Sequence, residues 1–368
     1  MLCRSKLRFR PAPQRMKTVF SGEYLMEHVS KKIKVAIIGA SGYSGVELVK
    51  ILLKHPGVEL AHVIGASTVG QRLDSIYPIF RKKTDLVMEP FQMDVLKTMD
   101  VVFLALPHGE AMKQAPELLD AGIRVIDFSG DFRFKSPELY EKWYDVPHTA
   151  PAYLDKAVYG LPELFKNEIT NCQFVANPGC YPTSAILALA PVFGLEYVAT
   201  DAITIASMSG TSGAGKKAKL DLIFSEVNET VKAYRVGNHQ HTPEIKTILE
   251  RVAGKEVNLA FVPHLLPITR GIYTTISLPL KQAVTRETVL KAYQEFYRDA
   301  AFVRILEDRA PEIKFVNDTN FCDISVAVDI TQQFVIINST IDNLIKGAAG
   351  QAVQNMNLMA GFAETEGL

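Results

Sequence analysis

The chain of 368 residues has few cysteines, no excess of charge of either sign and no long apolar run. Lysine and arginine together number 40, and aspartate and glutamate also number 40, so the formal net charge is zero. A neutral chain has no general electrostatic attraction to nucleic acid or to an anionic membrane. No apolar run approaches the ~20 residues that a membrane span needs. We therefore expect a globular protein that acts on a small molecule and binds neither nucleic acid nor membrane.

The cysteines are scattered, and no two of them form a C-x-x-C pair. They are Cys3, Cys172, Cys180 and Cys322. This spacing argues against a disulfide framework or a zinc ribbon and favours a reducing compartment. We expect a cytoplasmic protein in which any sulfur chemistry depends on a single thiol.

The first 22 residues hold six basic residues, whereas the first acidic residue is Glu23. An organelle transit peptide is basic and acid-poor in this way, but it is also rich in serine and amphipathic. Only Ser5 and Ser21 lie in this segment, and Met16 and Met26 are alternative starts. We interpret residues 1–30 as a disordered basic tail, with organelle import as the alternative.

Apolar strands and amphipathic helices alternate along residues 34–130. Strands are predicted at 35–38, 58–66, 100–106 and 124–128, and helices at 46–53 and 110–120. Uninterrupted apolar runs such as the first are typical of parallel strands buried on both faces. The alternation predicts a Rossmann-type doubly wound parallel sheet.

The pattern changes from about residue 200. Longer strands are predicted at 202–208, 257–262, 271–280, 324–330 and 334–339, with helices at 217–233, 243–252 and 285–299. This arrangement indicates an α+β domain with a mixed, largely antiparallel sheet covered by helices on one face. Residues 342–362 are predicted to form a last helix with no strand after it.

A glycine-rich turn, G-A-S-G-Y-S-G, follows the first predicted strand and precedes a helix, as a dinucleotide fingerprint requires. Gly39 permits a tight turn, Gly42 lets the backbone approach a pyrophosphate, and Gly45 permits close packing of strand and helix. The helix N-terminus offers free N–H groups and a positive dipole end to the anion. The spacing departs from G-x-G-x-x-G, so a turn without a ligand is the alternative. The expected cofactor contacts in the turn are Gly39, Ser41, Gly42, Tyr43, Ser44 and Gly45.

The stretch after the second predicted strand has no acidic residue; residues 65–72 read G-A-S-T-V-G-Q-R. An NAD site usually places Asp or Glu there to bind the ribose 2′-hydroxyl. Ser67 and Arg72 suit a 2′-phosphate better, so we predict NADP(H) as cofactor. A solvated loop residue is the alternative interpretation of Arg72.

Cys180 lies in N-P-G-C-Y-P-T, between a predicted strand at 173–176 and a predicted helix at 184–190. Pro182 suits the first position of that helix, which places Cys180 at or beside a helix N-terminus. There the helix dipole stabilises a thiolate and lowers the pKa of the thiol. We predict that Cys180 is a nucleophile, and we interpret Cys172 and Cys322 as buried structural cysteines.

A thiolate nucleophile needs a group that moves protons. The candidates are His108 in L-P-H-G and the pair His239 and His241 in G-N-H-Q-H-T-P-E. A metal site is the alternative interpretation of the pair, but no third Cys or His ligand lies nearby, so no metal is expected.

Residues 210–217, G-T-S-G-A-G-K-K, almost match the phosphate-binding P-loop G-x-x-x-x-G-K-[ST]. Lys217 stands where a magnesium-binding hydroxyl is required, which argues against an NTPase. A loop rich in N–H donors can still hold a carboxylate or a phosphate. The expected substrate contacts are Asn177, Ser209, Gly210 and Ser212.

Together these motifs resemble one family, the longer (type 1) N-acetyl-γ-glutamyl-phosphate reductases of arginine biosynthesis, which are semialdehyde dehydrogenases. The resemblance extends from about residue 34 to residue 362. The specific stretches are N-P-G-C-Y-P-T and D-N-L-I-K-G-A-A-G-Q-A-V-Q-N-M-N, supported by D-F-S-G-D-F-R-F and H-Q-H-T-P-E-I. The glycine turn is shared with many dehydrogenases.

The resemblance implies that Cys180 is the nucleophile and His239 the catalytic histidine, with His241 the weaker candidate. It also implies that the C-terminal helix returns to the first domain and brings Gly347 and Ala348 toward the cofactor. Pro107, in A-L-P-H-G, is a further expected cofactor contact. The expected domains are a cofactor domain at 31–175 with 341–368 and a catalytic, subunit-interface domain at 176–340. A homo-oligomer, dimer or tetramer, is expected.

The implied reaction reduces N-acetyl-γ-glutamyl phosphate with NADPH, through a thioester on Cys180, to N-acetylglutamate 5-semialdehyde and phosphate. The same core would serve aspartyl phosphate or N-acetyl-aminoadipyl phosphate, so these substrates are alternatives. A cysteine–histidine hydrolase, which needs no dinucleotide, and a redox-sensing NADP-binding protein, which has no turnover, are alternatives of other classes.

Overall fold

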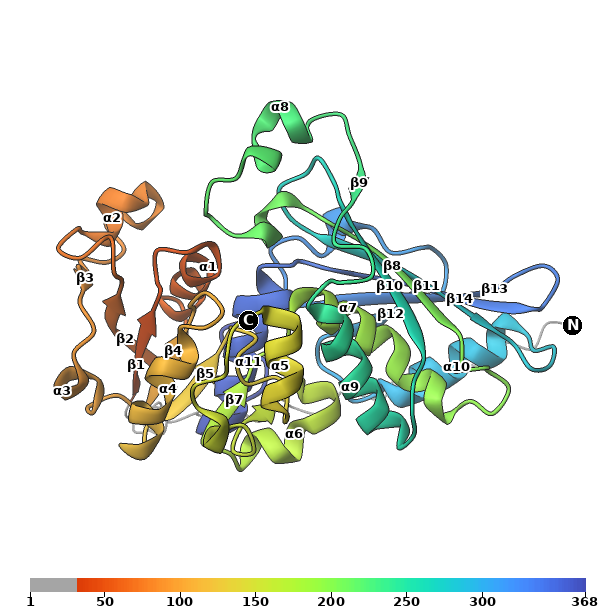
Figure 1. Ribbon diagram of the computed structural model, residues 1–368, viewed down its shortest axis with the longest axis horizontal. Helices are drawn as coiled ribbons and strands as arrows, with labels where there is room; N and C mark the ends of the chain where they lie inside the picture. Colours follow the sequence, from red (N-terminus) through yellow and green to blue (C-terminus); the bar gives the residue numbers. More distant parts are fainter. Residues whose placement is uncertain (1–31) are drawn as a thin grey trace, which may run out of the picture. The chain divides into compact units, whose positions relative to one another are not determined.

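Residues 32–368 are the part of the chain that this computed structural model describes, and they are built on two seven-stranded sheets (Figure 1). The prediction for residues 1–30 lies outside the described residues. The predicted fold class, a Rossmann-type sheet with a second, mixed sheet of α+β type, is confirmed. Within residues 32–368, no helix combines the length and the apolar character that crossing a membrane requires.

The first sheet is parallel throughout, with strand order β3-β2-β1-β4-β5-β7-β6. Its strands are β1 (Ile33–Ile38), β2 (Val58–Ile64), β3 (Met88–Glu89), β4 (Val101–Leu104), β5 (Arg124–Asp127), β6 (Val158–Tyr159) and β7 (Phe174–Ala176). The chain runs outward from β1 to β3 and then returns to β4 on the other side of β1. Doubly wound sheets bind ligands beyond the carboxyl ends of the strands at such a reversal.

Helices follow most strands of this sheet. They are α1 (Tyr43–Leu52), α2 (Leu73–Ile76), α3 (Met93–Leu96), α4 (Ala111–Asp120), α5 (Pro137–Tyr144) and α6 (Pro162–Thr170), with 3₁₀ turns at Pro78–Phe80 and Pro151–Tyr153. Every residue of β4 is buried, which explains why its sequence is apolar without alternation.

The second sheet is mixed, with strand order β12-β13-β14-β11-β8-β10-β9. The pairs β8 with β10 and β12 with β13 are parallel, and the other neighbours are antiparallel. The strands are β8 (Ile203–Ser209), β9 (Lys232–Ala233), β10 (Leu259–Leu265), β11 (Ile272–Pro279), β12 (Val303–Ile305), β13 (Cys322–Val328) and β14 (Phe334–Ile341). Burial alternates along β11, as expected when helices cover only one face.

That covered face carries α7 (Cys180–Leu189), α9 (His241–Ala253) and α10 (Arg286–Phe296) (Figure 1). Helix α7 packs against β11 and β14, α9 against α7 and β10, and α10 against β13. Further 3₁₀ turns lie at Ala190–Gly194, Thr211–Ala214 and Ile313–Phe315.

The helix predicted at residues 217–233 is wrong. The segment contains only a 3₁₀ turn (Leu220–Leu222), the four-residue α8 (Phe224–Val227) and the short β9. Leu220 and Phe224 are 80% and 81% exposed, so their side chains have no core to pack against. Most helical stability in proteins comes from packing an apolar face, which this segment lacks. In Figure 1 the segment around α8 projects away from the second sheet.

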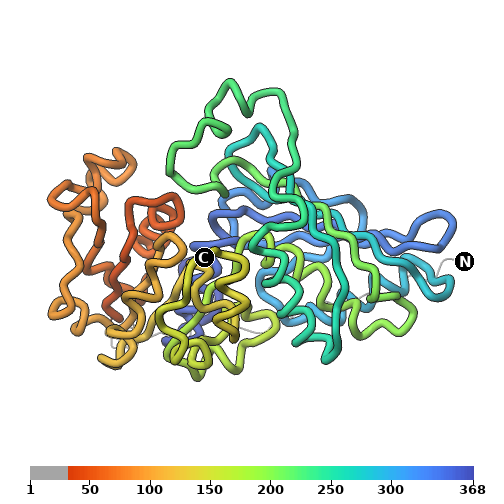
Figure 2. Tube along the Cα trace, in the orientation of Figure 1, coloured from red at the N-terminus to blue at the C-terminus, as the bar shows by residue number. Residues whose placement is uncertain are grey.

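The last segment of the chain returns to the first sheet. A π-helical turn (Ile345–Ala349) leads into α11 (Gly350–Ala360), so the helix predicted at 342–362 is confirmed with a wider first turn. Helix α11 packs against α6, α1 and β5. In the trace of Figure 2, the blue end of the chain lies among the yellow segments of the first half.

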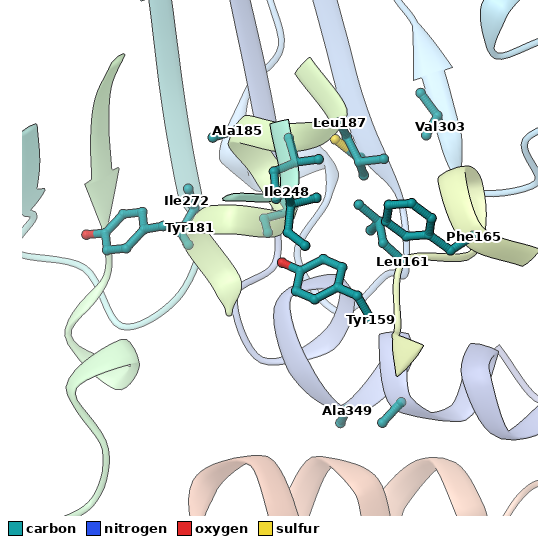
Figure 3. Packing of buried hydrophobic residues seen from close by; sticks show 14 of the residues in the cluster. Tyr159, Leu161, Phe165, Tyr181, Ala185, Leu187, Ile248, Ile272, Val303 and Ala349 are labelled. Carbon is teal, nitrogen blue, oxygen red and sulfur yellow. The ribbon is translucent and has the colours of Figure 1, made fainter. Parts of the chain in front are cut away.

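One apolar cluster continues from the first sheet to the second. Figure 3 shows part of it, with Leu161 and Phe165 at α6, Ala349 in the π-helical turn and Leu187 in α7. A site between the two sheets is therefore supported from both sides by a shared core.

Candidate active site

Cys180 is the first residue of α7, and Gly179 caps the helix. The placement of Cys180 at a helix N-terminus is confirmed, but the helix begins earlier than predicted, so Pro182 is its third residue and not its first. Proline is tolerated there because N–H groups of the first turn have no intrahelical partner. The Gly179 carbonyl accepts bonds from the Thr183 N–H at 2.9 Å and the Thr183 hydroxyl at 3.0 Å, which closes the first turn.

A buried ion pair holds the turn that precedes Cys180. Arg133 Nε donates to the carbonyl of Asn177 at 2.9 Å, and the Gly179 N–H donates to Glu244 Oε1 at 2.8 Å. Arg133 and Glu244 pair with each other at 3.0 Å, and their side chains are 4% and 0% exposed. Tyr159 also donates to Glu244, at 2.8 Å. The two charged side chains therefore bind the turn on both sides of Pro178 and hold it in place.

The C-terminal segment closes the other side of this turn. Asn177 Nδ2 donates to the carbonyl of Ala348 at 3.1 Å, and Asn177 Oδ1 accepts a bond from Asn355 Nδ2 at 3.0 Å. A Cβ added to Gly347 would lie 2.7 Å from the Cβ of Cys180. Gly347 and Ala348 thus lie beside the cysteine turn. The Asn177 side chain is buried, and both its amide nitrogen and its amide oxygen are hydrogen-bonded within the protein. In this arrangement it holds the turn in place, whereas we expected it to contact substrate.

Burial raises the pKa of the Cys180 thiol to about 11. The backbone N–H of Tyr181 and the charge of Arg133 act in the opposite direction, while Glu244 adds to the rise. The prediction of a lowered thiol pKa is therefore wrong, because desolvation outweighs the end of the helix. The thiol is protonated at neutral pH, and a nearby base must take its proton.

Two histidines pack around Tyr181, the residue after Cys180. The ring centroid of Tyr181 lies 5.6 Å from that of His239 and 5.9 Å from that of His241, and the two imidazoles are 4.9 Å apart. The sequence candidates thus come together in space. Burial lowers the pKa of His239 to about 4 and that of His241 well below its usual value, so both rings are neutral at pH 7.

The two rings differ in their hydrogen bonds. His239 Nδ1 accepts the backbone N–H of His241 at 3.1 Å, which leaves the ring proton of neutral His239 on Nε2 as a donor. His241 Nδ1 has no partner among the described residues, and its Nε2 borders Gly179. His108 accepts the Gly130 N–H at 2.8 Å and packs on Tyr144.

The glycine turn has the geometry that its sequence predicts. Gly39 has φ +92°, and a Cβ there would lie 2.2 Å from the carbonyl oxygen of Ala105. A Cβ on Gly45 would lie 2.4 Å from the Gly39 oxygen, whereas one on Gly42 would meet only that oxygen, at 3.5 Å. The tight turn and the close strand–helix packing are confirmed. The open side at Gly42, at the head of α1, fits the pyrophosphate of a dinucleotide.

Of the residues expected at the ribose, Arg72 is already bound to other side chains. Arg72 binds Asp74 through two bonds of 3.0 Å and Asp85 at 2.7 Å, so two carboxylates already offset its charge. Ser67 is exposed. The buried hydroxyl of Thr68 has no partner among the described residues. Pro107 is exposed just beyond β4.

The loop that resembles a P-loop offers few free N–H groups. Thr211 and Ser212 donate to the carbonyls of Ile268 and Thr269 at 2.9 and 3.0 Å. The N–H groups of Gly210, Gly213 and Gly215 also donate to protein carbonyls. Five N–H groups of this loop are therefore already bonded within the protein, and fewer remain for an anion than the sequence suggests. The expectation that the loop holds an anion stays a prediction.

The side chains expected at the substrate in this loop are also engaged. Ser209 and Ser212 are buried; the Ser209 hydroxyl donates to the Gly210 carbonyl at 3.0 Å, and the Ser212 hydroxyl accepts a bond from Asn343 at 3.0 Å. Cys322 is buried as predicted, whereas Cys172 is only partly buried because it lies in the surface turn between α6 and β7; both are free thiols. Among residues 32–368, no cluster of three or more His, Cys, Asp or Glu side chains could hold a metal ion.

Two family models match the chain. Residues 34–172 match the NAD-binding domain of semialdehyde dehydrogenases, and residues 180–343 match the dimerisation domain of the same enzymes. Together they define the class, a dehydrogenase that uses a nicotinamide dinucleotide.

The curated relatives are more specific. An N-acetyl-gamma-glutamyl-phosphate reductase of Desulfotalea psychrophila is 48% identical over 339 residues, which cover 91% of this chain and 98% of the relative. One from Caldicellulosiruptor saccharolyticus is 47% identical over 336 residues, with 91% and 98% covered. The chain belongs to the N-acetyl-gamma-glutamyl-phosphate reductase family of semialdehyde dehydrogenases.

Solved structures share the fold at low identity. Aspartate semialdehyde dehydrogenase II of Vibrio cholerae, in complex with ASA, has a TM-score of 0.70 and 16% identity, covering 90% of this chain and 99% of that one. The Candida albicans aspartate semialdehyde dehydrogenase, solved with NADP, has a TM-score of 0.67 and 17% identity over 90% and 99%.

Proposed function

We propose that the chain reduces N-acetyl-γ-glutamyl phosphate to N-acetylglutamate 5-semialdehyde and phosphate with NADPH, through a thioester on Cys180. The observation that carries this proposal is the position of Cys180: it is the first residue of α7, between the shared core and the C-terminal segment, with two neutral histidines beside Tyr181. The family membership of the chain supports the substrate.

The first half of the reaction forms the thioester. A histidine takes the proton of the Cys180 thiol, the sulfur attacks the γ-carbonyl carbon, and the bond from that carbon to the phosphate oxygen breaks. Phosphate leaves with the electron pair of that bond. The unpaired N–H groups at the head of α7 stabilise the negative charge that develops on the carbonyl oxygen.

The second half releases the aldehyde. When bound, the nicotinamide dinucleotide would supply one hydride to the thioester carbonyl. His239, whose Nε2 carries a proton, is placed to donate a hydrogen bond to the oxygen of the resulting thiohemiacetal. When the carbon–sulfur bond breaks, the carbonyl re-forms, and the Cys180 thiolate recovers the proton from the histidine that took it in the first half of the reaction.

We propose NADP(H) as cofactor because residues 65–72, directly after β2, include no acidic residue and carry the hydroxyls of Ser67 and Thr68. Arg72 reaches a 2′-phosphate only if that group competes with Asp74 and Asp85. The proposed contacts are Gly39, Ser41, Gly42, Tyr43, Ser44, Gly45, Ser67, Arg72, Pro107, Gly347 and Ala348. The proposed substrate contacts are Asn177, Ser209, Gly210 and Ser212.

We also propose the domain division given by the sequence, 31–175 with 341–368 and 176–340, because α11 packs on α6, α1 and β5. The dimerisation domain matched at 180–343 supports a homo-oligomer. A cytoplasmic location is proposed because the mechanism needs a reduced thiol.

Phosphate-dependent reduction of NADP by N-acetylglutamate semialdehyde tests the function in the reverse direction. Wild type is expected to turn over, and Cys180→Ser to lose about 10³-fold or more of the rate. Aspartate semialdehyde, assayed in parallel, is the control for substrate. Turnover by Cys180→Ser near the wild-type rate, or a preference for aspartate semialdehyde, contradicts the proposal.

A further inference from the structure

The glycine turn has no cation of its own. Residues 39–45 contain no basic side chain, although the pyrophosphate that they are proposed to bind carries negative charge on both phosphates. Arg72, the nearest basic residue after β2, is already paired with Asp74 and Asp85. The N–H groups at the head of α1 supply partial charge only.

Lys216 brings an ammonium group to this turn from the other half of the molecule. Its Nζ donates to the hydroxyl of Tyr77 at 2.8 Å and to the carbonyl of Ser41 at 3.3 Å, and it lies 4.8 Å from the centre of the Tyr77 ring. The Tyr77 hydroxyl itself donates to the Ser41 carbonyl at 2.8 Å. The cation is therefore fixed at the turn by two partners.

The ammonium is still available to an anion. It has three N–H donors, of which Ser41 and Tyr77 take two. No carboxylate of residues 32–368 forms an ion pair with Lys216, whereas Lys50 and Arg270 both pair with Glu47 nearby. The charge of Lys216 is thus unneutralised.

Lys216 also borders a cavity of about 440 Å³ between α1 and the segment after β8. Tyr43 of the glycine turn lines this cavity on one side, and Lys216 and Arg270 line it on the other. Gly215, with φ +80°, turns the chain just before the lysine. Since most of the loop's own N–H groups are occupied, the Lys216 side chain is its strongest remaining donor to an anion.

We propose that Lys216 binds the pyrophosphate of the nicotinamide dinucleotide and so ties the substrate half of the molecule to the glycine turn. This inference rests on the proposed function only in requiring that a dinucleotide binds at residues 39–45. In this proposal, the segment that resembles a P-loop binds the anion through its lysine side chain and not through its backbone.

Fluorescence titration of the full chain with NADPH and with NADH tests the proposal. Lys216→Gln is expected to weaken the binding of both dinucleotides by about ten- to fiftyfold, since it removes one charge-assisted bond to a group that both contain. Lys216→Arg keeps the charge and is expected to retain most of the affinity. Lys217→Gln, which removes the neighbouring charge from a residue without a bond to the turn, is the matched control and is expected to stay within about twofold.

Salt separates a ligand from a merely structural lysine. If Lys216 binds phosphate, the affinities of wild type and Lys216→Gln converge as ionic strength rises toward 1 M, where the screening length falls to about 3 Å. A salt-independent gap, a loss confined to NADPH, or an effect no larger than that of Lys217→Gln overturns the proposal. If wild type binds neither dinucleotide, the proposed function fails with it; if wild type binds and turns over while Lys216→Gln binds normally, only this inference fails.

Discussion

Opposing effects act on the pKa of the Cys180 thiol, and their balance sets its reactivity. The head of α7 and Arg133 favour the thiolate, whereas burial and Glu244 favour the thiol, and burial has the largest effect. The motif N-P-G-C predicted the helix end because it is a local feature. It did not predict the burial, because the groups that pack around Cys180, among them Gly347, come from distant parts of the chain.

Alkylation of the free enzyme tests this balance. Because the pKa of Cys180 is raised to about 11, the thiolate fraction at pH 7 is small and grows about tenfold with each pH unit. The rate of iodoacetamide modification of the Cys180 peptide, followed by mass spectrometry, is expected to rise continuously from pH 7 to pH 10. A rate that levels off below pH 8 contradicts the dominance of burial.

The histidines give a second prediction. His239→Ala is expected to lower kcat/KM by about 10²–10⁴-fold, in the range for a general acid–base group, and His241→Ala by less. Since the pKa of His239 is lowered to about 4, the wild-type rate should fall on the acid side only as pH approaches that value. A larger loss in His241→Ala, whose Nδ1 has no partner, would assign the proton transfer to His241.

At the scale of elements, the pair Arg133–Glu244 joins the loop after β5 to helix α9 and holds the turn before α7. Neither residue was predicted to belong to the site. A signal for both is present in the sequence, because each is a charged residue within a stretch that matches the family. These stretches are D-F-R-F and H-T-P-E-I. Only the fold shows that the two charges meet, because 111 residues separate them.

Glu244→Gln tests whether the ion pair with Arg133 holds the turn before Cys180. The amide keeps an acceptor for the Gly179 N–H but leaves the buried charge of Arg133 unpaired, so we expect a loss of about 3–5 kcal/mol in the free energy of unfolding by urea. Because Glu244 raises the pKa of Cys180, the alkylation profile should also shift to lower pH. Glu250→Gln, at a partly exposed position of the same helix, is the control. An unchanged profile with lowered stability would reduce the pair to a structural role.

The elements themselves were predicted where an apolar face meets a core. Strands β1, β4 and β8 and helices α9 and α10 lie close to their predicted bounds. The exception at 217–233 carries apolar residues that the structure leaves exposed, and no local pattern distinguishes that outcome from a packed helix.

At the scale of the whole molecule, the C-terminal segment connects the two sheets. Lys346 and Glu163 form a fully buried ion pair at 2.6 Å between the π-helical turn and α6, and the next residue, Gly347, touches Cys180. The last residues of the chain therefore help to shape a site that begins more than 160 positions earlier. This closure followed from the family resemblance and not from periodicity.

Gly347→Ala tests that closure. Its Cβ would lie 2.7 Å from the Cβ of Cys180, so the turn must shift, and we expect a loss of about 1–3 kcal/mol in stability together with a marked fall in kcat. Gly194→Ala, whose Cβ would meet nothing within 4 Å, is the matched control and should leave both unchanged. Equal activity of the two variants would mean that the C-terminal segment does not constrain the cysteine.

Omitting phosphate tests for the covalent intermediate on Cys180. With N-acetylglutamate semialdehyde and NADP alone, the reaction should stop at the thioester and release a burst of about one equivalent of NADPH per active site. Mass spectrometry of the quenched enzyme should then find the acyl group on the Cys180 peptide. No burst, or an acyl group on Cys172 or Cys322 while Cys180 stays free, would rule out a thioester on Cys180.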